Sequence, residues 1–141
     1  MGKIKWKKYD YTVQWGPGNS IAYRPLIEVH IASPKNSKGL NVLALIDSGT
    51  DGTVFNADVA RSLDIDPGAC QKIKMGGIGV MEGFICDIKL TIPDFKISME
   101  IPVAFLEKPP FDALLGQRFF FEQFSVMFEK SKNRFQIALA D

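Results

Sequence analysis

The chain has 141 residues, of which 46% are hydrophobic. This length and apolar content predict one compact domain with a core of its own and leave little room for a second domain. The formal net charge at pH 7 is +1, so overall charge gives no reason to expect nucleic acid, an anionic membrane or a strongly acidic substrate as a partner.

The first 20 residues carry four lysines and no long apolar run. We interpret Lys3, Lys5, Lys7 and Lys8 as a solvated face rather than a binding site. Because no long apolar run follows them, we expect no signal peptide. No segment approaches the roughly 20 apolar residues that span a bilayer, so we expect a soluble protein without a membrane-spanning segment.

The first two predicted strands lie in the first third of the chain. In residues 26–31, apolar residues alternate with Glu28 and His30, which predicts a strand with one buried face and His30 on the surface. Residues 42–46 are apolar throughout and predict a short strand buried on both faces. This second strand ends abruptly at Asp47.

A single short helix interrupts the strands. Asn56 is placed to cap it, and Val59, Ala60 and Leu63 are spaced to face the core. The Pro-Gly pair at 67–68 closes this unit.

The second half of the chain reads as further strands. Residues 84–92 and 97–103 both alternate and are separated by the turn residues Pro93 and Asp94, so we expect them to form a hairpin. Cys86 falls on the apolar face and is predicted to lie in the core. A short apolar run at 113–116, a Phe-rich helical turn at 119–124 and strands near 126–128 and 135–139 complete an all-β prediction.

Cysteine and histidine are scarce. Cys70, Cys86 and His30 have no zinc-ligand spacing and form no Cys-x-x-Cys motif, so we expect no metal site. Two cysteines argue against a disulfide framework and leave one optional bridge open. The cytoplasm is then the simplest location to expect.

The most informative stretch follows the second predicted strand. Burying Asp47 directly after an apolar strand is costly unless hydrogen bonds or function compensate. Ser48 and Thr50 supply hydroxyl groups beside this carboxylate, and Gly49 permits a tight turn in which backbone N–H groups point at it. The pattern favours a functional carboxylate.

A second glycine-rich segment covers Met75, Gly76, Gly77, Ile78 and Gly79. Glycines at a hairpin tip permit positive φ angles, close approach to a peptide backbone and the mobility of a lid. The segment does not fit a phosphate-binding loop, because the glycine spacing is wrong and a strand follows where a helix is needed.

These two segments, followed by Ala-Leu-Leu-Gly-Gln-Arg-Phe-Phe at 113–120, resemble retropepsin-like aspartic proteases in the same chain order. The resemblance spans about residues 20 to 140. It implies an all-β fold built as a closed, orthogonal β-barrel with one short helix, a flap hairpin and a homodimer. We assign residues 21–141 to this domain and residues 1–20 to an N-terminal extension without a clear counterpart.

The resemblance also implies a role for each matching residue. It makes Asp47 the catalytic carboxylate, supported by Ser48, Gly49 and Thr50 in its loop. The substrate-covering flap would be Met75, Gly76, Gly77, Ile78 and Gly79. The strand at 113–116 would lie beneath the catalytic loop, and neither a cofactor nor a metal ion would be needed.

One position departs from the family pattern. An arginine commonly follows the glycine directly, whereas Gln117 stands between Gly116 and Arg118 in this chain. The arginine that braces an acidic residue beside the active-site loop, here Asp51, therefore either arrives from a shifted position or is absent.

Hydrolysis by an aspartic protease needs two carboxylates that share one proton. The chain has only one Asp-Ser/Thr-Gly tripeptide, so a homodimer with two copies of Asp47 at a twofold axis would complete the pair and act on a polypeptide. The main alternative is a dimeric binding or scaffold module of the same fold with weak catalysis. A second alternative is a small β-barrel that binds a ligand or a protein terminus without a catalytic role for Asp47.

Overall fold

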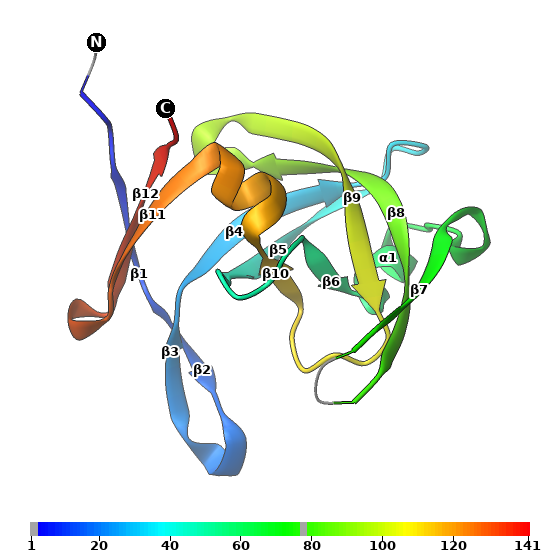
Figure 1. The fold of residues 1–141 in the computed structure, drawn as a ribbon, viewed down its shortest axis with the longest axis horizontal. Coiled ribbons are helices and arrows are strands. Elements are labelled where there is room, and N and C mark those ends of the chain that lie inside the picture. The colour runs from blue at the N-terminus through cyan, green and yellow to red at the C-terminus, as the bar shows by residue number, and fades with distance from the viewer. Residues whose placement is uncertain (1–2, 77–78) are drawn as a thin grey trace.

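The computed structural model describes residues 3–76 and 79–141 and is built mainly from strands (Figure 1). The strands are β1 (Lys7–Asp10), β2 (Thr12–Trp15), β3 (Ile21–Arg24), β4 (Leu26–Ala32), β5 (Gly39–Ile46), β6 (Val54–Asn56), β7 (Gln71–Met75), β8 (Met81–Ile92), β9 (Ile97–Leu106), β10 (Ala113–Leu115), β11 (Phe124–Glu129) and β12 (Arg134–Leu139). In the described part of the chain, α1 (Ala57–Ser62) is the one α-helix, so the predicted mostly-β class is confirmed. None of the described helices is long and apolar enough to cross a membrane.

The largest sheet has the strand order β4-β5-β10-β6-β9-β8-β7, and β8 also pairs with β4. The predicted hairpin of residues 84–92 and 97–103 is confirmed as β8 and β9, which pair from Gly83 opposite Leu106 to Ile92 opposite Ile97. The inward side chains of this sheet form the core, in which Phe55, Phe84 and Phe105 are buried. Phe105 packs near both other rings, at centroid distances of 6.2 and 5.5 Å.

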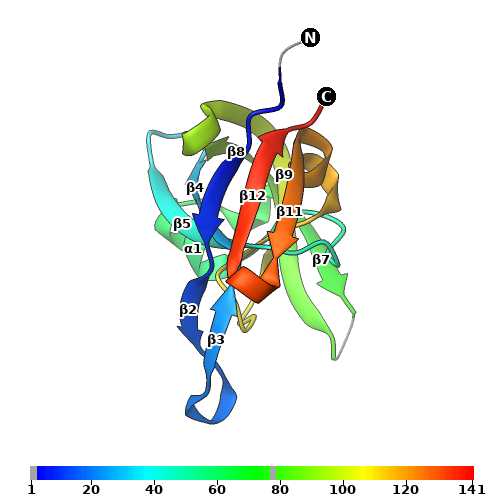
Figure 2. The same ribbon diagram turned by 90° about the vertical axis from the view of Figure 1, so that its left-hand side faces the viewer.

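Two smaller sheets are built with the N-terminal segment. β1 pairs with β12, and β12 pairs with β11, which gives a three-stranded antiparallel sheet (Figure 2). β2 and β3 form a separate two-stranded hairpin that projects from the body of the molecule. The N-terminal residues therefore contribute strands, and the predicted boundary at residue 20 stays a prediction.

The burial of β5 differs from the prediction on one face. Val42, Ala44 and Ile46 are buried as expected, but Leu43 is 50% exposed and Leu45 is only partly buried. The prediction of a strand buried on both faces was wrong, because a continuous apolar run does not reveal whether its second face packs on the core or lines a surface groove. Here that face borders the groove described below.

The helix begins where the sequence predicted. The Asn56 side chain accepts a hydrogen bond from the backbone N–H of Asp58 at 3.0 Å, which satisfies one of the free donors at the helix start. Ala57, Ala60 and Leu63 are fully buried, so this short helix is held mainly by its packing against the sheet.

The optional disulfide left open by the sequence is present. Cys70 is bonded to Cys86, with a Cα–Cα distance of 5.2 Å. Cys86 lies on the buried face of β8, as predicted, and Cys70 directly precedes β7. The bond therefore joins the base of the β7–β8 hairpin.

The Phe-rich segment contains one irregular helical turn at Gln117–Phe121, which fits the predicted helical turn in part. Arg118 is extended, and Phe119 has a φ of +69° and a ψ of −64°. The backbone N–H of Phe119 donates to the Glu122 carboxylate at 2.8 Å, which holds this unusual turn. Phe120 and Phe124 are buried, in agreement with a core role.

Candidate active site

The Asp47 loop connects β5 to β6, and β10 lies between these two strands. β10 runs parallel to β5, with Leu115 opposite Ile46, and antiparallel to β6, with Leu114 opposite Val54. The backbone N–H of Asp47 donates to the Leu115 carbonyl at 2.9 Å. The loop therefore begins at the end of β5 and ends at the start of β6, and β10 pairs with both of these strands.

Two groups of the loop itself hydrogen-bond to the Asp47 carboxylate. The Gly49 backbone N–H donates to Oδ1 at 2.9 Å, and the Thr50 hydroxyl donates to Oδ2 at 2.9 Å. Asp47 is only partly buried, so its carboxylate is oriented by protein groups and remains accessible. Ser48 is exposed and is fixed through its carbonyl oxygen, which accepts from the Gln117 side chain at 2.6 Å.

The loop rests directly on Gly116. A Cβ atom at this position would lie 2.3 Å from the Thr50 carbonyl oxygen and 2.4 Å from that of Gly52, both far inside van der Waals contact. The following N–H groups also support the loop, because Gln117 donates to the Thr50 carbonyl at 2.8 Å and Arg118 donates to the Asp51 carbonyl at 2.7 Å. Only glycine permits so close an approach.

The sequence left open whether Arg118 braces Asp51 from its shifted position. Within residues 3–76 and 79–141, Arg118 forms no ion pair with Asp51. Arg118 contributes its backbone N–H to the Asp51 carbonyl, and the inserted Gln117 contributes its side-chain amide to the Ser48 carbonyl. Hydrogen bonds to backbone carbonyls thus support the loop, and of the two alternatives left open by the sequence the described residues show the one without the charged brace.

The glycine-rich segment lies at the end of the β7–β8 hairpin, which pairs from Gln71 opposite Ile85 to Met75 opposite Met81. Gly77 and Ile78 lie outside the described residues. Met75, Gly76 and Gly79 line a small pocket of about 170 Å³ together with Thr50 of the Asp47 loop. The structure therefore brings the described part of the predicted flap to the Asp47 loop.

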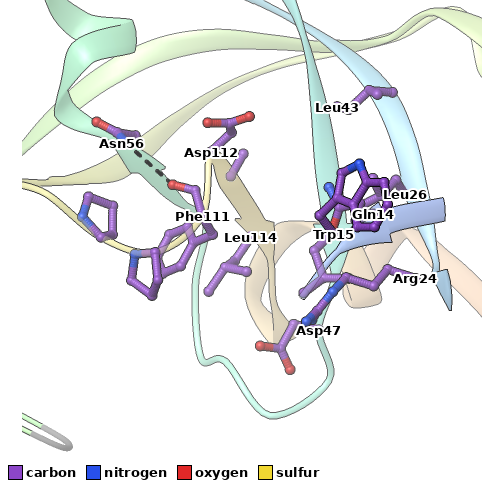
Figure 3. A pocket seen from close by; sticks show the side chains of 14 residues that line it. Gln14, Trp15, Arg24, Leu26, Leu43, Asp47, Asn56, Phe111, Asp112 and Leu114 are labelled. Atoms are coloured by element: carbon purple, nitrogen blue, oxygen red, sulfur yellow. Dashed lines mark hydrogen bonds between the residues drawn. The ribbon is translucent and has the colours of Figure 1, made fainter. Parts of the chain in front are cut away.

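A larger groove of about 840 Å³ opens beside Asp47 (Figure 3). Leu45 and Leu114, on the neighbouring strands β5 and β10, form its floor. One wall carries Phe111 and Asp112, and the other carries Trp15 and Arg24 from the β2–β3 hairpin. The groove is lined by both apolar and charged side chains.

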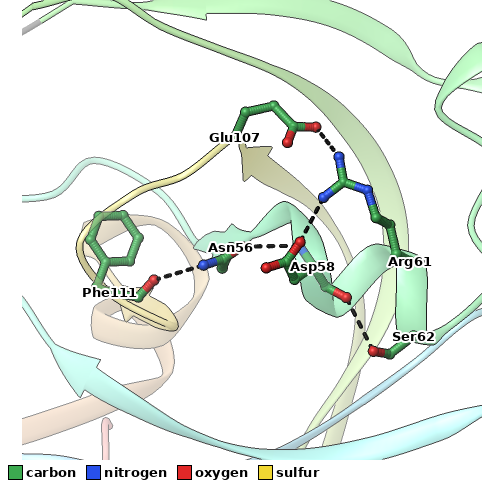
Figure 4. Close-up of polar contacts among 6 residues, drawn as sticks. All are labelled: Asn56, Asp58, Arg61, Ser62, Glu107 and Phe111. Carbon is green, nitrogen blue, oxygen red and sulfur yellow. Dashed lines mark hydrogen bonds and ion pairs between the residues drawn. The ribbon is translucent and has the colours of Figure 1, made fainter.

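The wall that contains Phe111 is tied to the start of the helix (Figure 4). The Asn56 backbone N–H donates to the Asp112 carbonyl at 2.8 Å, and the Asn56 side-chain amide donates to the Phe111 carbonyl at 3.5 Å. Arg61 pairs with both Asp58 and Glu107, which links the helix to the end of β9. These bonds fix the loop on this side of the groove.

Gln14, Trp15 and Arg24 were not among the predicted site residues, although all three line the groove. A signal was present in the sequence. Apolar Val13 and Trp15 alternate with polar residues, a Gly-Pro-Gly-Asn turn follows, and alternation resumes at Ile21. This pattern predicts a hairpin. Because proline has no N–H group to continue the pairing, Pro25 ends the hairpin directly before β4.

The arrangement offers one oriented carboxylate, that of Asp47. No group of three or more His, Cys, Asp or Glu side chains in the described residues is placed to hold a metal ion. Asp47 accepts hydrogen bonds from Gly49 and Thr50 of its own loop, and it also lines the groove. One carboxylate of this kind can act as a base or an acid, but not as both at once.

No protein-family model and no curated protein sequence matches the chain. Solved structures do. A retropepsin-like aspartic protease from Rickettsia conorii is 11% identical in sequence and superposes with a TM-score of 0.59. The aligned region covers 99% of this chain and 97% of the Rickettsia chain. The EIAV protease in complex with the inhibitor HBY-793 is 22% identical, with coverages of 70% and 86% and a TM-score of 0.54.

A third similar structure is the retroviral protease-like domain of Ddi1 from Leishmania major, at 15% identity and a TM-score of 0.49. The first two similarities show that the chain has the fold of retropepsin-like aspartic proteases. The resemblance predicted from three short segments is thereby confirmed at the level of the fold.

Proposed function

We propose that the protein is an aspartic endopeptidase that works as a homodimer, with one Asp47 carboxylate from each chain. The observation that carries this proposal is the Asp47 carboxylate itself. It is oriented by Gly49 and Thr50, supported from below by Gly116, and accessible from a groove large enough for peptide side chains. A twofold axis beside Asp47 would bring two such loops face to face.

The chemistry follows from placing two carboxylates in contact. Like charges oppose double ionisation, so the pair holds one shared proton. The ionised carboxylate takes a proton from a water molecule, whose oxygen attacks the peptide carbonyl carbon, while the protonated carboxyl gives its proton to the carbonyl oxygen. Collapse of the tetrahedral intermediate breaks the C–N bond, with a proton passed to the departing nitrogen.

The β7–β8 hairpin is proposed to act as the flap over the substrate. Its described end already borders a pocket shared with Thr50, and the Cys70–Cys86 bond anchors its base. An extended polypeptide would lie between the hairpin and the Asp47 loops, hydrogen-bonded as an added strand. Pairing of β8 with both β9 and β4 supports the predicted closure of the barrel.

The direct test is Asp47→Asn. Asparagine keeps the shape of aspartate, and the Thr50 hydroxyl can accept a hydrogen bond from the new amide, so the fold should be retained. Peptidase activity should fall about a thousandfold or more, because asparagine cannot exchange the shared proton. Cleavage of a denatured-protein mixture, followed by mass spectrometry, measures this loss, and full activity in the variant contradicts the proposal.

A second candidate function is a dimeric binding or scaffold module of the same fold. The observation that favours it is the lack of an ion pair between Arg118 and Asp51 in the described part of the chain. The same cleavage survey separates the two functions, because a binding module releases no Asp47-dependent products from any of the denatured proteins.

A further inference from the structure

The retropepsin resemblance assigns no role to the β2–β3 hairpin. Its pairing places Val13 opposite Tyr23 and Trp15 opposite Ile21, so these four side chains share one face of the ribbon. All four are substantially exposed, at 45% to 78%, and Trp15 is the most exposed of them. So large an apolar side chain held in water usually marks a surface that binds something.

The position of the hairpin beside Asp47 is fixed by the backbone. β3 runs into β4 through Pro25, whose carbonyl accepts a hydrogen bond at 3.0 Å from the N–H of Ile46, the residue directly before Asp47. Because proline has no N–H and cannot extend the pairing, the chain turns out of the main sheet at this point. The hairpin therefore projects from the edge of the active-site loop.

Contacts with the turn between β11 and β12 hold the base of the hairpin. The Tyr11 N–H donates to the Asn133 carbonyl at 2.7 Å. The Lys130 ammonium lies 5.3 Å from the centre of the Tyr11 ring and 5.6 Å from that of Tyr23. These contacts cover Tyr23 in part and leave Trp15, near the turn, as the open end of the apolar face.

Trp15 lines the same groove as Asp47, and so does Leu43 (Figure 3). Leu43 is 50% exposed on the outward face of β5, where a polar residue would be expected if water were its only neighbour. Two large apolar side chains from different elements thus stand exposed in one groove. An occupant that covers both would bury apolar surface, which is the main source of binding free energy for such groups.

We infer that Trp15 is a specificity-determining residue, which forms with Leu43 a subsite for a bulky apolar side chain of a polypeptide substrate. This inference rests on the proposed peptidase function. The indole ring suits the task because it offers a large rigid surface with only two rotatable bonds to order. The substrate class is an extended polypeptide with an aromatic or large aliphatic residue close to the scissile bond.

The experiment uses pairs of fluorogenic peptides built on a sequence that the wild-type protein cleaves. The two members of a pair differ only in carrying Phe or Ala at one of the four positions that flank the scissile bond. At one such position, Trp15→Ala should lower kcat/KM for the Phe peptide about tenfold or more and leave the Ala peptide within about twofold. Trp15→Phe should restore most of the preference.

Ile21→Ala is the matched control, since Ile21 faces Trp15 across the hairpin and does not line the groove. It should leave the preference unchanged, and both alanine variants should keep the unfolding temperature and the dimer dissociation constant of the wild type. An unchanged preference in Trp15→Ala overturns the inference. A uniform loss for both peptides together with weaker dimers also overturns it, because the hairpin would then be covered by a second copy.

These outcomes separate the inference from the proposed function. If the wild-type protein cleaves peptides in an Asp47-dependent manner but Trp15→Ala keeps the preference, only the inference fails. If the dimeric wild-type protein cleaves none of the denatured proteins, the proposed function fails and the inference fails with it.

Discussion

Gly116 illustrates how a missing side chain positions the Asp47 loop. The loop backbone occupies the space that a Cβ atom would need, so Thr50 and Gly52 lie directly against this glycine. The position of Asp47 therefore depends on a contact between two backbone segments. A clash at this contact cannot be relieved by moving a side chain. This is why a small substitution at Gly116 is expected to have a large effect.

We predict that Gly116→Ala destabilises the fold and disables the site together. The added methyl group must displace backbone carbonyls, so the free energy of unfolding should fall by about 1–3 kcal/mol or more. Any Asp47-dependent cleavage should fall as well, since the loop moves. Urea unfolding and peptidase assays measure the two effects.

Gly52→Ala is the control for this prediction, because a Cβ at Gly52 meets no atom within 4 Å. That variant should lie within about 0.5 kcal/mol of the wild type. If Gly116→Ala is equally harmless, the loop is not fixed by the close backbone contact.

Around Asp47, local motifs were easier to predict from the sequence than contacts between distant segments. The hydrogen bonds from Gly49 and Thr50 to Asp47 span two and three residues, so the tripeptide and its neighbours contain them. The support from Gln117 joins two residues 69 positions apart, and it lies beside a turn in which Phe119 has a positive φ that a bulky residue rarely adopts. The sequence therefore raised the question of the brace without answering it.

β7 lies at one edge of the largest sheet. In residues 3–76 and 79–141 it pairs with β8 alone, and the Cys70–Cys86 bond holds its base covalently. Four of its five residues are exposed. Such an element can move without disturbing the core, which suits a lid.

We predict that Gly79→Val impairs turnover more than stability. Gly79 has a φ of +92°, which strains any residue with a side chain, although the space around it is open. The free energy of unfolding should fall by about 1–2 kcal/mol, and kcat/KM by about tenfold or more, because the tip loses its native conformation.

Gly76→Val supplies the comparison for the hairpin tip, since Gly76 has equally open surroundings and no positive φ. Chemical unfolding and peptide cleavage should show a smaller effect on both quantities in this variant. Global unfolding of Gly79→Val, or unchanged turnover, would make the segment a structural turn instead of a lid.

The end of the β11–β12 hairpin carries a carboxylate whose charge should contribute to stability. Arg134 donates to both oxygens of Glu129 at 3.0 Å, and Gln136 donates to one of them at 2.8 Å. The Arg134 hydrogen bonds first, and then Gln136, lower the pKa of Glu129 from 4.5 to about 2.

A lowered carboxylate pKa stabilises the folded protein above the unfolded pKa. We predict that the free-energy advantage of the wild type over Glu129→Gln is constant above about pH 5 and shrinks as the pH falls from 4.5 towards 2. Chemical unfolding of both proteins across this range measures it. An advantage that does not change with pH would show that the charge of Glu129 is unimportant for stability.

The strands were largely predictable, because apolar and polar residues alternate in a strand that has one face in the core and the other in water. β8 fulfils this condition, because every second residue from position 84 to 92 is apolar and buried: Phe84, Cys86, Ile88, Leu90 and Ile92. β5 does not, since its second face lines a groove, and the pattern alone cannot distinguish a groove from a core. The β2–β3 hairpin was missed because both its faces are largely exposed.

For the whole molecule, the decisive fact is that one chain brings one Asp-Ser-Gly loop to the groove. The fold similarity to solved retropepsin-like proteases covers 99% of the chain in one case, so a second loop of this kind has no place in the fold. Counting motifs in the sequence led to the prediction of a homodimer, which stays a prediction. The sequence does not predict which surface a second copy would contact, because such a surface combines residues far apart in the chain.

Activity should therefore depend on chain association. If each dimer holds one site made from two Asp47 side chains, activity per chain must fall on dilution below the dimer dissociation constant, because a monomer holds half of the carboxylate pair. Analytical ultracentrifugation and peptidase assays over the same concentration range should give coincident transitions. Constant activity per chain down to concentrations at which only monomers remain would contradict a shared site.

Mixing wild-type and Asp47→Asn chains gives the sharper version of this test. When the chains exchange freely and associate equally well, an equal mixture contains about one quarter wild-type homodimer by random pairing. Its total activity should be about a quarter of that of wild type at the same total chain concentration, because a heterodimer with one carboxylate lacks the second group that the reaction needs. The peptidase rate is measured against the mutant fraction after an exchange incubation. A quadratic fall assigns both Asp47 carboxylates to one site, whereas a straight line would mean that each chain works alone.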